Sequence, residues 1–359
     1  MFDYSIYNGK RVFVTGHTGF KGTWLCRILA MLGADVTGYA LEPPTEPSLF
    51  EITGTERMIR SAVGDIRNFG ALKKAFDGCD PEIVFHLAAQ PIVREGYRNP
   101  ACTYETNVMG TVNLLECARL SGRVRSFLNV TTDKVYMNPE NPSHAFTEDE
   151  RLDGFDPYSN SKSCSELVTA SYKRSFFADG VTAVSTARAG NVIGGGDYAP
   201  DRIVPDCVRA ITAGRPVRVR NRHSVRPYQH VLEPLFAYLL IAGAQMNDRG
   251  LEGSYNVGPA LSDCRTTGEL ATAFTAAWGD GASWTDETPD SVAAAPHEAG
   301  LLRLDSSLIK ERLGFVPLWD FGTAVKKSAE WYKAVAGGAC PADITDLQIK
   351  EYMNGIHIQ

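Results

Sequence analysis

The chain has 359 residues, enough for about two domains or one large one, and a formal net charge of −6 at pH 7. Hydrophobic residues make up 44% and charged residues 22%, a balance typical of globular proteins that excludes wholesale disorder and fibrous repeats. Because 36 Lys and Arg face 42 Asp and Glu, no basic excess favours general binding to nucleic acids or membranes.

Short apolar runs alternate with helical patterns through the first half of the chain. We expect strands at residues 11–15, 34–40, 58–63, 82–89, 125–132 and 181–187. We expect helices at residues 19–32, 99–120 and 156–178. Near-continuous apolar strands separated by helices predict an α/β fold with a doubly wound parallel (Rossmann) sheet, whose ligand crevice lies at the carboxyl ends of the strands.

The alternation becomes less regular after about residue 190. Turns rich in Gly and Pro, a short strand at 216–220 and a polar segment at 222–231 follow. We therefore expect residues 1–190 to form the dinucleotide-binding domain, and residues 191–359 to form mainly a smaller, mixed α/β substrate region. A segment at about 225–260 is expected to return to the first sheet.

The eight cysteines are scattered, with no C-x-x-C pair and no histidine at zinc spacing. We expect free, mostly buried thiols and no metal site. No segment approaches about 18 uninterrupted apolar residues, and no signal peptide is visible before the first strand. These features predict a soluble, cytoplasmic protein that does not enter a membrane.

The segment TGHTGFKG places Gly16, Gly19 and Gly22 directly after the first strand and at the entrance of a helix. One glycine permits a tight turn, one lets the backbone approach a pyrophosphate, and one lets the helix pack on the strand. The free N–H groups and the helix dipole then attract the anion. This turn predicts a dinucleotide site.

The choice between NAD and NADP depends on the end of the second strand. An acidic residue there normally binds the ribose of NAD, and Glu42 lies slightly beyond that end. His17 and Lys21 add positive charge that would tolerate the 2′-phosphate of NADP. We expect NAD on the chemistry described below, while NADP stays open.

Tyr158 and Lys162 lie four residues apart at the start of a predicted helix, so both fall on one helix face. An ammonium group near the phenol would lower the pKa of Tyr158 and fit it to remove a hydroxyl proton near neutral pH. After a dinucleotide turn and a strand that ends in Thr131 and Thr132, this pair indicates a proton-transfer site.

Six segments resemble, in chain order, the motifs of the extended short-chain dehydrogenase/reductase family: TGHTGFKG, GDIRN, HLAAQ, TNVMGT, TTDKVY and YSNSK. Within it, the chain is similar to nucleotide-sugar 4,6-dehydratases over about residues 9–335. The segments GYALEPPTEPSLFE and RPYQHVLEPL resemble those of members that act on CDP-glucose. The resemblance implies a hydro-lyase that converts CDP-D-glucose to CDP-4-dehydro-6-deoxy-D-glucose and water, for bacterial deoxysugar and O-antigen synthesis.

The resemblance also implies a catalytic sequence. Tyr158, assisted by Lys162 and Thr132, removes the proton of the C4 hydroxyl while a hydride passes to the nicotinamide. Lys134 then removes the C5 proton while Asp133 protonates the departing C6 hydroxyl. The hydride returns to C6, and C5 is reprotonated. Many related dehydratases have Glu at the position of Lys134, so the base here would be a neutral lysine, which requires a lowered pKa.

Further residues are assigned by the same resemblance. The cofactor-binding set is Gly16, His17, Thr18, Gly19, Phe20, Lys21, Gly22, Asp65, Ile66, Leu87, Ala88, Ala89, Asn107, Thr131, Tyr158 and Lys162. The set for the nucleotide-sugar is Gln90, Asn191, Arg202, Arg226, Asn256 and His297, with Arg226 on the diphosphate because a guanidinium binds phosphate bidentately. The helices at 99–120 and 156–178 resemble a four-helix dimer interface, which implies a homodimer or a homotetramer.

Two other interpretations stay open. The first is a dehydratase or epimerase of another UDP-, GDP- or dTDP-sugar, because the loop that recognises the base cannot be identified from the residues. The second is a non-catalytic dinucleotide-binding sensor. The complete set of Thr132, Tyr158 and Lys162 argues against a sensor, since a sensor needs no proton-transfer chain.

Overall fold

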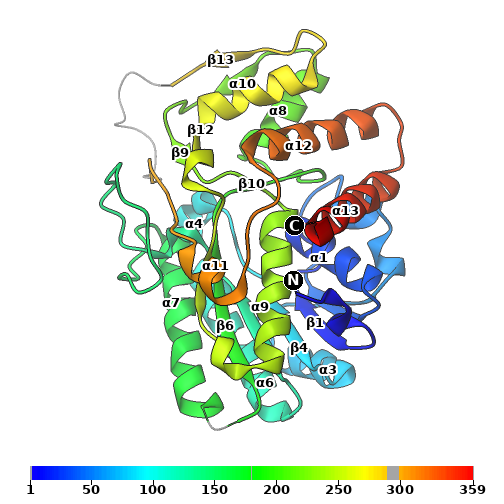
Figure 1. Ribbon diagram of the computed structural model, residues 1–359, viewed down its shortest axis with the longest axis vertical. Helices are drawn as coiled ribbons and strands as arrows, with labels where there is room; N and C mark the ends of the chain where they lie inside the picture. Colours follow the sequence, from blue (N-terminus) through cyan, green and yellow to red (C-terminus); the bar gives the residue numbers. More distant parts are fainter. Residues whose placement is uncertain (1, 179, 289–298, 359) are drawn as a thin grey trace.

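A seven-stranded parallel sheet forms the centre of the computed structural model, which describes residues 2–178, 180–288 and 299–358 (Figure 1). Its strand order is β11-β6-β5-β4-β1-β2-β3, and every neighbouring pair is parallel. The order changes direction between β1 and β4, which is where ligands bind in doubly wound sheets. The strands are β1 (Arg11–Thr15), β2 (Asp35–Ala40), β3 (Arg60–Val63), β4 (Ile83–His86), β5 (Ser126–Val130), β6 (Ala183–Ala189) and β11 (Ser254–Val257).

The predicted doubly wound sheet is confirmed, but β3, β4 and β5 are shorter than expected, and β6 lies two residues later. The apolar run at 82–89 predicts a strand up to Ala89, but β4 ends at His86. Beyond it, the backbone N–H of Leu87 donates to the carbonyl of Thr15, and the N–H of Ala88 donates to the hydroxyl of Thr15. The chain therefore turns over the end of β1 instead of continuing the sheet.

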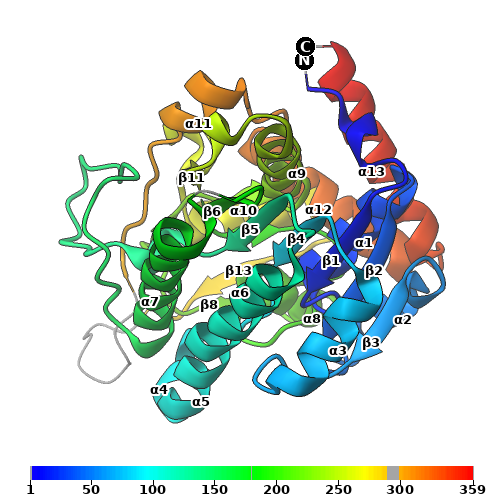
Figure 2. The ribbon, with the colours of Figure 1, turned by 90° about the horizontal axis from the view of Figure 1, so that it is seen from below.

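Helices cover both faces of this sheet (Figure 2). On one face are α3 (Phe69–Cys79), α6 (Gly110–Ser121) and α7 (Pro157–Tyr172). On the other are α1 (Phe20–Met31), α9 (Leu232–Asn247) and α11 (Ser307–Leu313). The predicted helix at 99–120 consists of α5 (Pro100–Tyr104), a π-helical segment (Glu105–Met109) and α6, while α7 continues into a second π-helical segment (Lys173–Phe177). The short helices α2 (Leu49–Ile52) and α4 (Val93–Arg98) complete this half.

Three small sheets and three helices form the other part of the molecule, at the top of Figure 1. The sheets pair β7 (Val192–Ile193) with β10 (Gln229–His230), β8 (Val217–Val219) with β13 (Trp284–Asp286), and β9 (Val225–Arg226) with β12 (Arg265–Thr266). The helices are α8 (Ile203–Thr212), α10 (Thr267–Trp278) and α12 (Phe321–Ala336). The chain returns to the main sheet at α9 and β11, within the expected segment.

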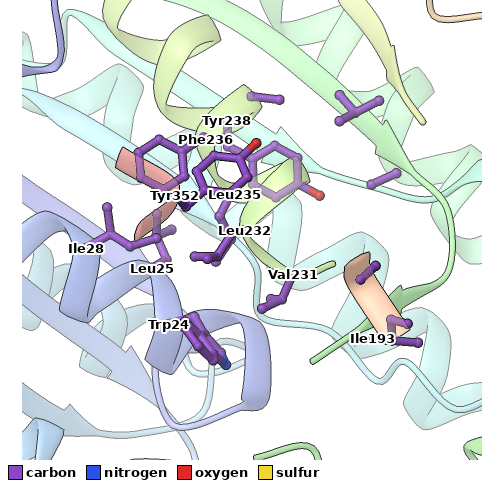
Figure 3. Packing of buried hydrophobic residues seen from close by; sticks show 14 of the residues in the cluster. Trp24, Leu25, Ile28, Ile193, Val231, Leu232, Leu235, Phe236, Tyr238 and Tyr352 are labelled. Atoms are coloured by element: carbon purple, nitrogen blue, oxygen red, sulfur yellow. The ribbon is translucent and has the colours of Figure 1, made fainter. Parts of the chain in front are cut away.

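The largest hydrophobic core joins α1, α9 and the last helix, α13 (Pro341–Ile358). Figure 3 shows Trp24 and Leu25 of α1, Leu235 of α9 and Tyr352 of α13 in this core. The hydroxyl of Tyr352 donates to the buried carboxylate of Glu233, 2.6 Å away. Apolar packing thus links the helix after the glycine-rich turn to both the middle and the end of the chain.

Several smaller expectations can be compared with this fold. The ring of His86 lies between the hydroxyls of Thr15 and Thr111, and His230 is buried beside Trp319, so both are packed histidines. All eight cysteines are free thiols, and four of them are buried. Within the described residues, no helix combines the length and the apolar character that a membrane span requires.

Candidate active site

The glycine-rich turn joins β1 to α1. Gly16 has a φ of +80°, and a Cβ on it would lie 2.8 Å from the backbone nitrogen of Ala88. A Cβ on Gly22 would lie 2.0 Å from the carbonyl oxygen of Gly16, so the fold itself requires these two glycines.

Gly19, the third glycine of this turn, differs from the other two. A Cβ at this position would meet only the carbonyl oxygen of Gly16, at 3.4 Å, so the packing of the protein tolerates a side chain here. Gly19 is also the N-cap of α1 and supplies no side-chain hydrogen bond to the first turn of the helix. A glycine that the fold does not require, beside uncapped N–H groups, fits the close approach of a pyrophosphate. The turn therefore fits a dinucleotide.

The side chains of His17 and Lys21 do not provide the positive charge expected near β2. His17 is fully buried, its Nε2 is 2.7 Å from the hydroxyl of Ser61, and burial lowers its pKa to about 4, so its ring is neutral at pH 7. The ammonium of Lys21 instead donates to the hydroxyl of Tyr238 at 3.3 Å, and burial lowers its pKa to about 7. The expected positive charge for a 2′-phosphate therefore has no support from these side chains, because the ring of His17 is uncharged and Lys21 is directed toward α9.

Thr132 and Asp133 follow the carboxyl end of β5. The side chain of Thr132 caps a short 3-10 turn (Asp133–Val135), and its hydroxyl donates to Oδ1 of Asp133 at 2.9 Å. Oδ2 of Asp133 is buried beside Gly190 and accepts no hydrogen bond from the described residues. Burial raises the pKa of Asp133, although Lys134, Thr132 and Arg226 act in the opposite direction. A buried carboxyl group with one unused oxygen and a raised pKa is suited to give up a proton.

Tyr158 and Lys162 lie in α7, next to the end of β5. Tyr158 is 9% exposed, and Thr132 acts to lower its pKa. The ammonium of Lys162 donates to the carbonyl of Val130 at 3.0 Å, and burial lowers the pKa of this lysine to about 8. Thr132 therefore binds the predicted acid, Asp133, and acts on the pKa of the predicted base, Tyr158.

The predicted lowering of the Tyr158 pKa by Lys162 is not seen. Burial raises the pKa of Tyr158 to about 12, because desolvation of the phenolate outweighs the opposing effects of Thr132 and Arg202. The cation with the largest effect on Tyr158 is Arg202, whereas Lys162 is directed to the backbone of β5. Without ligands, Tyr158 therefore stays protonated at neutral pH.

Positive charge predominates around Asp133. Lys21, Lys134 and Arg226 each act on the pKa of its carboxyl group, and Arg202 and Lys162 act on that of Lys21. The Arg202 guanidinium is itself paired with Asp197 at 3.0 Å. Five cationic side chains near one reactive carboxyl group favour anionic ligands such as diphosphates.

Asn256 is not placed to bind a nucleotide-sugar. It is fully buried in β11, its amide donates to the carbonyls of Phe146 and Asp305, and its oxygen accepts from the hydroxyl of Tyr136 at 2.6 Å. All of these partners belong to the protein, so the side chain of Asn256 is engaged within the fold. Through these bonds Asn256 holds the loops that contain Phe146 and Asp305 against β11.

The polar groups of three other assigned residues are also used within the protein. The amide of Asn107 binds the backbone of Gln90 through both its nitrogen and its oxygen, and it also donates to Ser161. The amide of Gln90 donates to Thr103 and accepts from the N–H of Ile92. The hydroxyl of Thr131 donates to a buried carboxylate, that of Glu166. These contacts hold the loop after β4 and the end of β5 in place.

The remaining assigned residues lie around the carboxyl edge of the sheet. Asp65 and Ile66 follow β3, and Asp65 is paired with Arg67 at 2.6 Å. Leu87, Ala88 and Ala89 form the loop after β4, Thr18 donates to the carbonyl of Leu41, Phe20 begins α1, and Asn191 precedes β7. His297 lies outside the described residues.

Two residues that the motifs did not single out contact this site. Tyr238 of α9 accepts the hydrogen bond from Lys21, and nothing in the helical pattern of α9 distinguishes it from a core residue. Glu166 of α7 is 2% exposed, and its carboxylate accepts a hydrogen bond from the hydroxyl of Thr131. Its spacing of four residues from Lys162 places both on one helix face, which is a signal the sequence did contain.

Comparisons with known proteins agree with this geometry. The family model described as GDP-mannose 4,6 dehydratase matches residues 13–328. The chain is 43% identical to a CDP-glucose 4,6-dehydratase of Salmonella typhimurium, over 99% of both chains. In fold the chain is similar to a dTDP-glucose 4,6-dehydratase of Bacillus anthracis in complex with NAD, with a TM-score of 0.74 and 20% identity over 90% of this chain and 96% of that one. It is also similar to a UDP-glucose 4-epimerase of Thermotoga maritima with UDP-glucose, with a TM-score of 0.76 and 23% identity over 90% of this chain and 99% of that one.

The family match covers most of the chain, from β1 through α12, and therefore includes the glycine-rich turn, the end of β5 and the Tyr158–Lys162 pair. The similarity to the Salmonella protein extends over α13 as well. The chain belongs to the GDP-mannose 4,6 dehydratase family of the extended short-chain dehydrogenases/reductases.

Proposed function

We propose that this protein is an NAD-dependent hydro-lyase that converts CDP-D-glucose to CDP-4-dehydro-6-deoxy-D-glucose and water. One observation carries the reaction type: the Thr132 hydroxyl donates to Asp133, and both residues act on the pKa of Tyr158, so an acid and a base lie close together. A simple epimerase needs no acid beside the tyrosine, whereas loss of water requires one. The near full-length similarity to a CDP-glucose 4,6-dehydratase supports the choice of nucleotide.

The residues that would hold the cofactor lie along the edge formed by β1, β3 and β4. Gly16, Gly19 and Gly22 present the N–H groups of the turn, while Asp65 and Ala88 line the loops on either side. NAD held there would supply a hydride acceptor that is regenerated within each turnover. The neutral ring of His17 offers no cation for a 2′-phosphate, which supports NAD over NADP.

The chain's own residues divide the proton transfers. Tyr158 takes the proton of the C4 hydroxyl, with Thr132 orienting its phenol and Lys162 contributing positive charge. Because burial alone raises the Tyr158 pKa, bound ligands must supply part of the stabilisation of its phenolate. Lys134 removes the C5 proton, and Asp133 delivers its proton to the departing C6 hydroxyl. C5 regains a proton when the hydride returns to C6. Arg202 and Arg226 bind the diphosphate.

A panel of four nucleotide-glucoses tests this proposal. The purified protein is incubated with the CDP-, UDP-, GDP- and dTDP-glucoses, and 4-keto product is detected by its absorbance in alkali. We expect product from CDP-glucose and none from Tyr158→Phe. If only another nucleotide-glucose gave product, the substrate assignment would be wrong and that sugar nucleotide would replace CDP-glucose. If none of the four gave product, the result would favour a dinucleotide-binding sensor.

We also propose that the protein is a homodimer or a homotetramer. Leu167 and Phe176 are more than half exposed along α7 and its π-helical extension, and Met109 is half exposed in the segment before α6. Exposed apolar side chains on neighbouring helices are typical of interfaces. Light scattering of the protein and of Leu167→Lys tests this, because an interface there predicts a smaller particle for the variant. The division at about residue 190 into two domains likewise stays a proposal.

A further inference from the structure

Glu166 is a buried acid that the proposed chemistry does not use. It lies on α7, four residues after Lys162 and on the same helix face. Its carboxylate accepts from the hydroxyl of Thr131, from the hydroxyl of Thr186 at 2.8 Å, and from the guanidinium of Arg188 at 3.0 Å. Both oxygens are therefore occupied, and the ion pair with Arg188 is almost completely buried.

Lys162 is an ammonium group in surroundings that oppose its charge. It is 4% exposed, and burial lowers its pKa to about 8, with Glu166 acting in the opposite direction. Two groups that the structure describes on other elements lie near Lys162, and neither carries negative charge: Lys162 lowers the pKa of Lys21 of α1, and burial and Lys162 lower that of His86 of β4. Asp133, beyond the end of β5, acts on Lys21.

The groups packed against Glu166 from other elements are Arg188 of β6, Tyr136 and Glu148. Arg188 donates to the hydroxyl of Tyr136 at 2.8 Å and to the carbonyl of Glu148 at 2.9 Å. Arg188 thus has partners of its own besides Glu166. The Glu166 carboxylate lies between this guanidinium and the start of the TTDKVY segment, to which Thr131 connects it.

We propose that Glu166 is a positioning residue that keeps Lys162 protonated and, through Thr131, fixes the end of β5 from which Thr132 and Asp133 extend. The catalytic consequence rests on the proposed function, whereas the effect on Lys162 does not. An ammonium that lost its proton near neutral pH would stop stabilising the phenolate of Tyr158. Residues four apart on one helix face have Cβ atoms about 5 to 6 Å apart. An opposite charge within about 4 to 6 Å moves a pKa by about 1 to 3 pH units, which is enough to decide the state of Lys162 at pH 7 to 8.

The test is a pH titration of Lys162 in the full-length protein, labelled with ¹³C at the lysine Cε. The Lys162 signal is identified by its loss in Lys162→Arg. In Glu166→Gln we expect its midpoint to fall by about 1 to 3 pH units. Glu166→Asp, which keeps the charge, should retain most of the wild-type midpoint. Thr186→Val removes one hydrogen bond from the same carboxylate without removing charge, and it should leave the midpoint unchanged.

Glu166→Gln leaves Arg188 without its acid, so this variant risks failing to fold. The double variant Glu166→Gln/Arg188→Met removes both charges of the pair, and its Lys162 midpoint is compared with that of Arg188→Met. A lower midpoint in the double variant supports the proposal. An unchanged midpoint in Glu166→Gln, or in the double variant relative to Arg188→Met, overturns it and leaves Glu166 as a purely structural acid.

A kinetic measurement extends the result to the reaction. With CDP-glucose, the alkaline limb of kcat in Glu166→Gln should move to lower pH by the same amount as the Lys162 midpoint, with KM changed less than kcat. The activity should recover as the pH is lowered. If the wild type forms no product, the proposed function fails while the titration still decides the role of Glu166.

Discussion

Asp133, after β5, and Glu233, in α9, are both buried carboxyl groups whose pKa is raised by burial, but their oxygens are used differently. Glu233 accepts from the backbone N–H groups of Leu318 and Trp319 and from the hydroxyl of Tyr352. Asp133 accepts from Thr132 alone, and its Oδ2 has no partner among the described residues. A fully bonded buried acid holds the fold together, whereas a buried acid with a free oxygen is available for a substrate.

The largest effect is expected at Asp133, where a catalytic role and a role in stability predict different results. Replacing Asp133 by Asn keeps the shape but removes the transferable proton, so we expect kcat with CDP-glucose to fall by about 10²- to 10⁴-fold. The free energy of unfolding, measured in urea, should stay within about 1 kcal/mol of wild type, because no complete hydrogen-bond set is broken. An activity within tenfold of wild type would remove Asp133 from the reaction.

The pH dependence of stability should report on Glu233. Burial raises the pKa of Glu233 from 4.5 to about 7, so the folded state binds more protons than the unfolded state between these values. Its contribution to stability is therefore complete below pH 4.5 and is lost as the pH rises through 7. The loss amounts to about 3 kcal/mol, from the size of the shift. Comparison of urea unfolding from pH 4.5 to 7.5 in wild type and Glu233→Gln should show this slope in wild type only.

Tyr352→Phe tests the structural role of Glu233 by removing the hydroxyl that donates to its carboxylate. Removing the hydroxyl leaves Glu233 with its two backbone donors and without its bond to α13, at a cost of about 1 to 3 kcal/mol in the free energy of unfolding. We expect kcat to be unchanged, because the bond lies in the core between α9 and α13 and not beside Asp133. A loss of activity without a loss of stability would contradict the assignment of this acid to the fold.

The smallest effect concerns the glycine-rich turn, where the same distinction holds between what the fold requires and what a ligand requires. Gly19→Ala should cost about 1 kcal/mol or less in stability, because its Cβ meets ordinary contact distances. Its Kd for NAD, measured by calorimetry, should rise at least about tenfold, since a methyl group would stand where a ligand approaches the backbone. Gly78→Ala in α3, where a Cβ meets nothing within 4 Å, is the matched control and should leave the Kd unchanged.

The sequence by itself predicted a doubly wound parallel sheet, a glycine-rich turn after the first strand, and Thr132, Asp133, Tyr158 and Lys162 as candidate site residues. These features are local: apolar periodicity, turn glycines and the i, i+4 spacing act within a few residues, so they are visible without the fold. The end of β4 was misplaced because the bonds that stop it come from Thr15, far away in the chain.

Only the tertiary structure decided which polar groups are free. Asn256 and Thr131 match the family motifs, but partners from distant segments use their hydrogen-bonding groups. Likewise, neutralisation of His17 and the raised pKa of Tyr158 come from burial, which depends on the packing of several elements at once. Residue type and spacing place a group in a site, whereas desolvation and long-range hydrogen bonds set its charge and its availability.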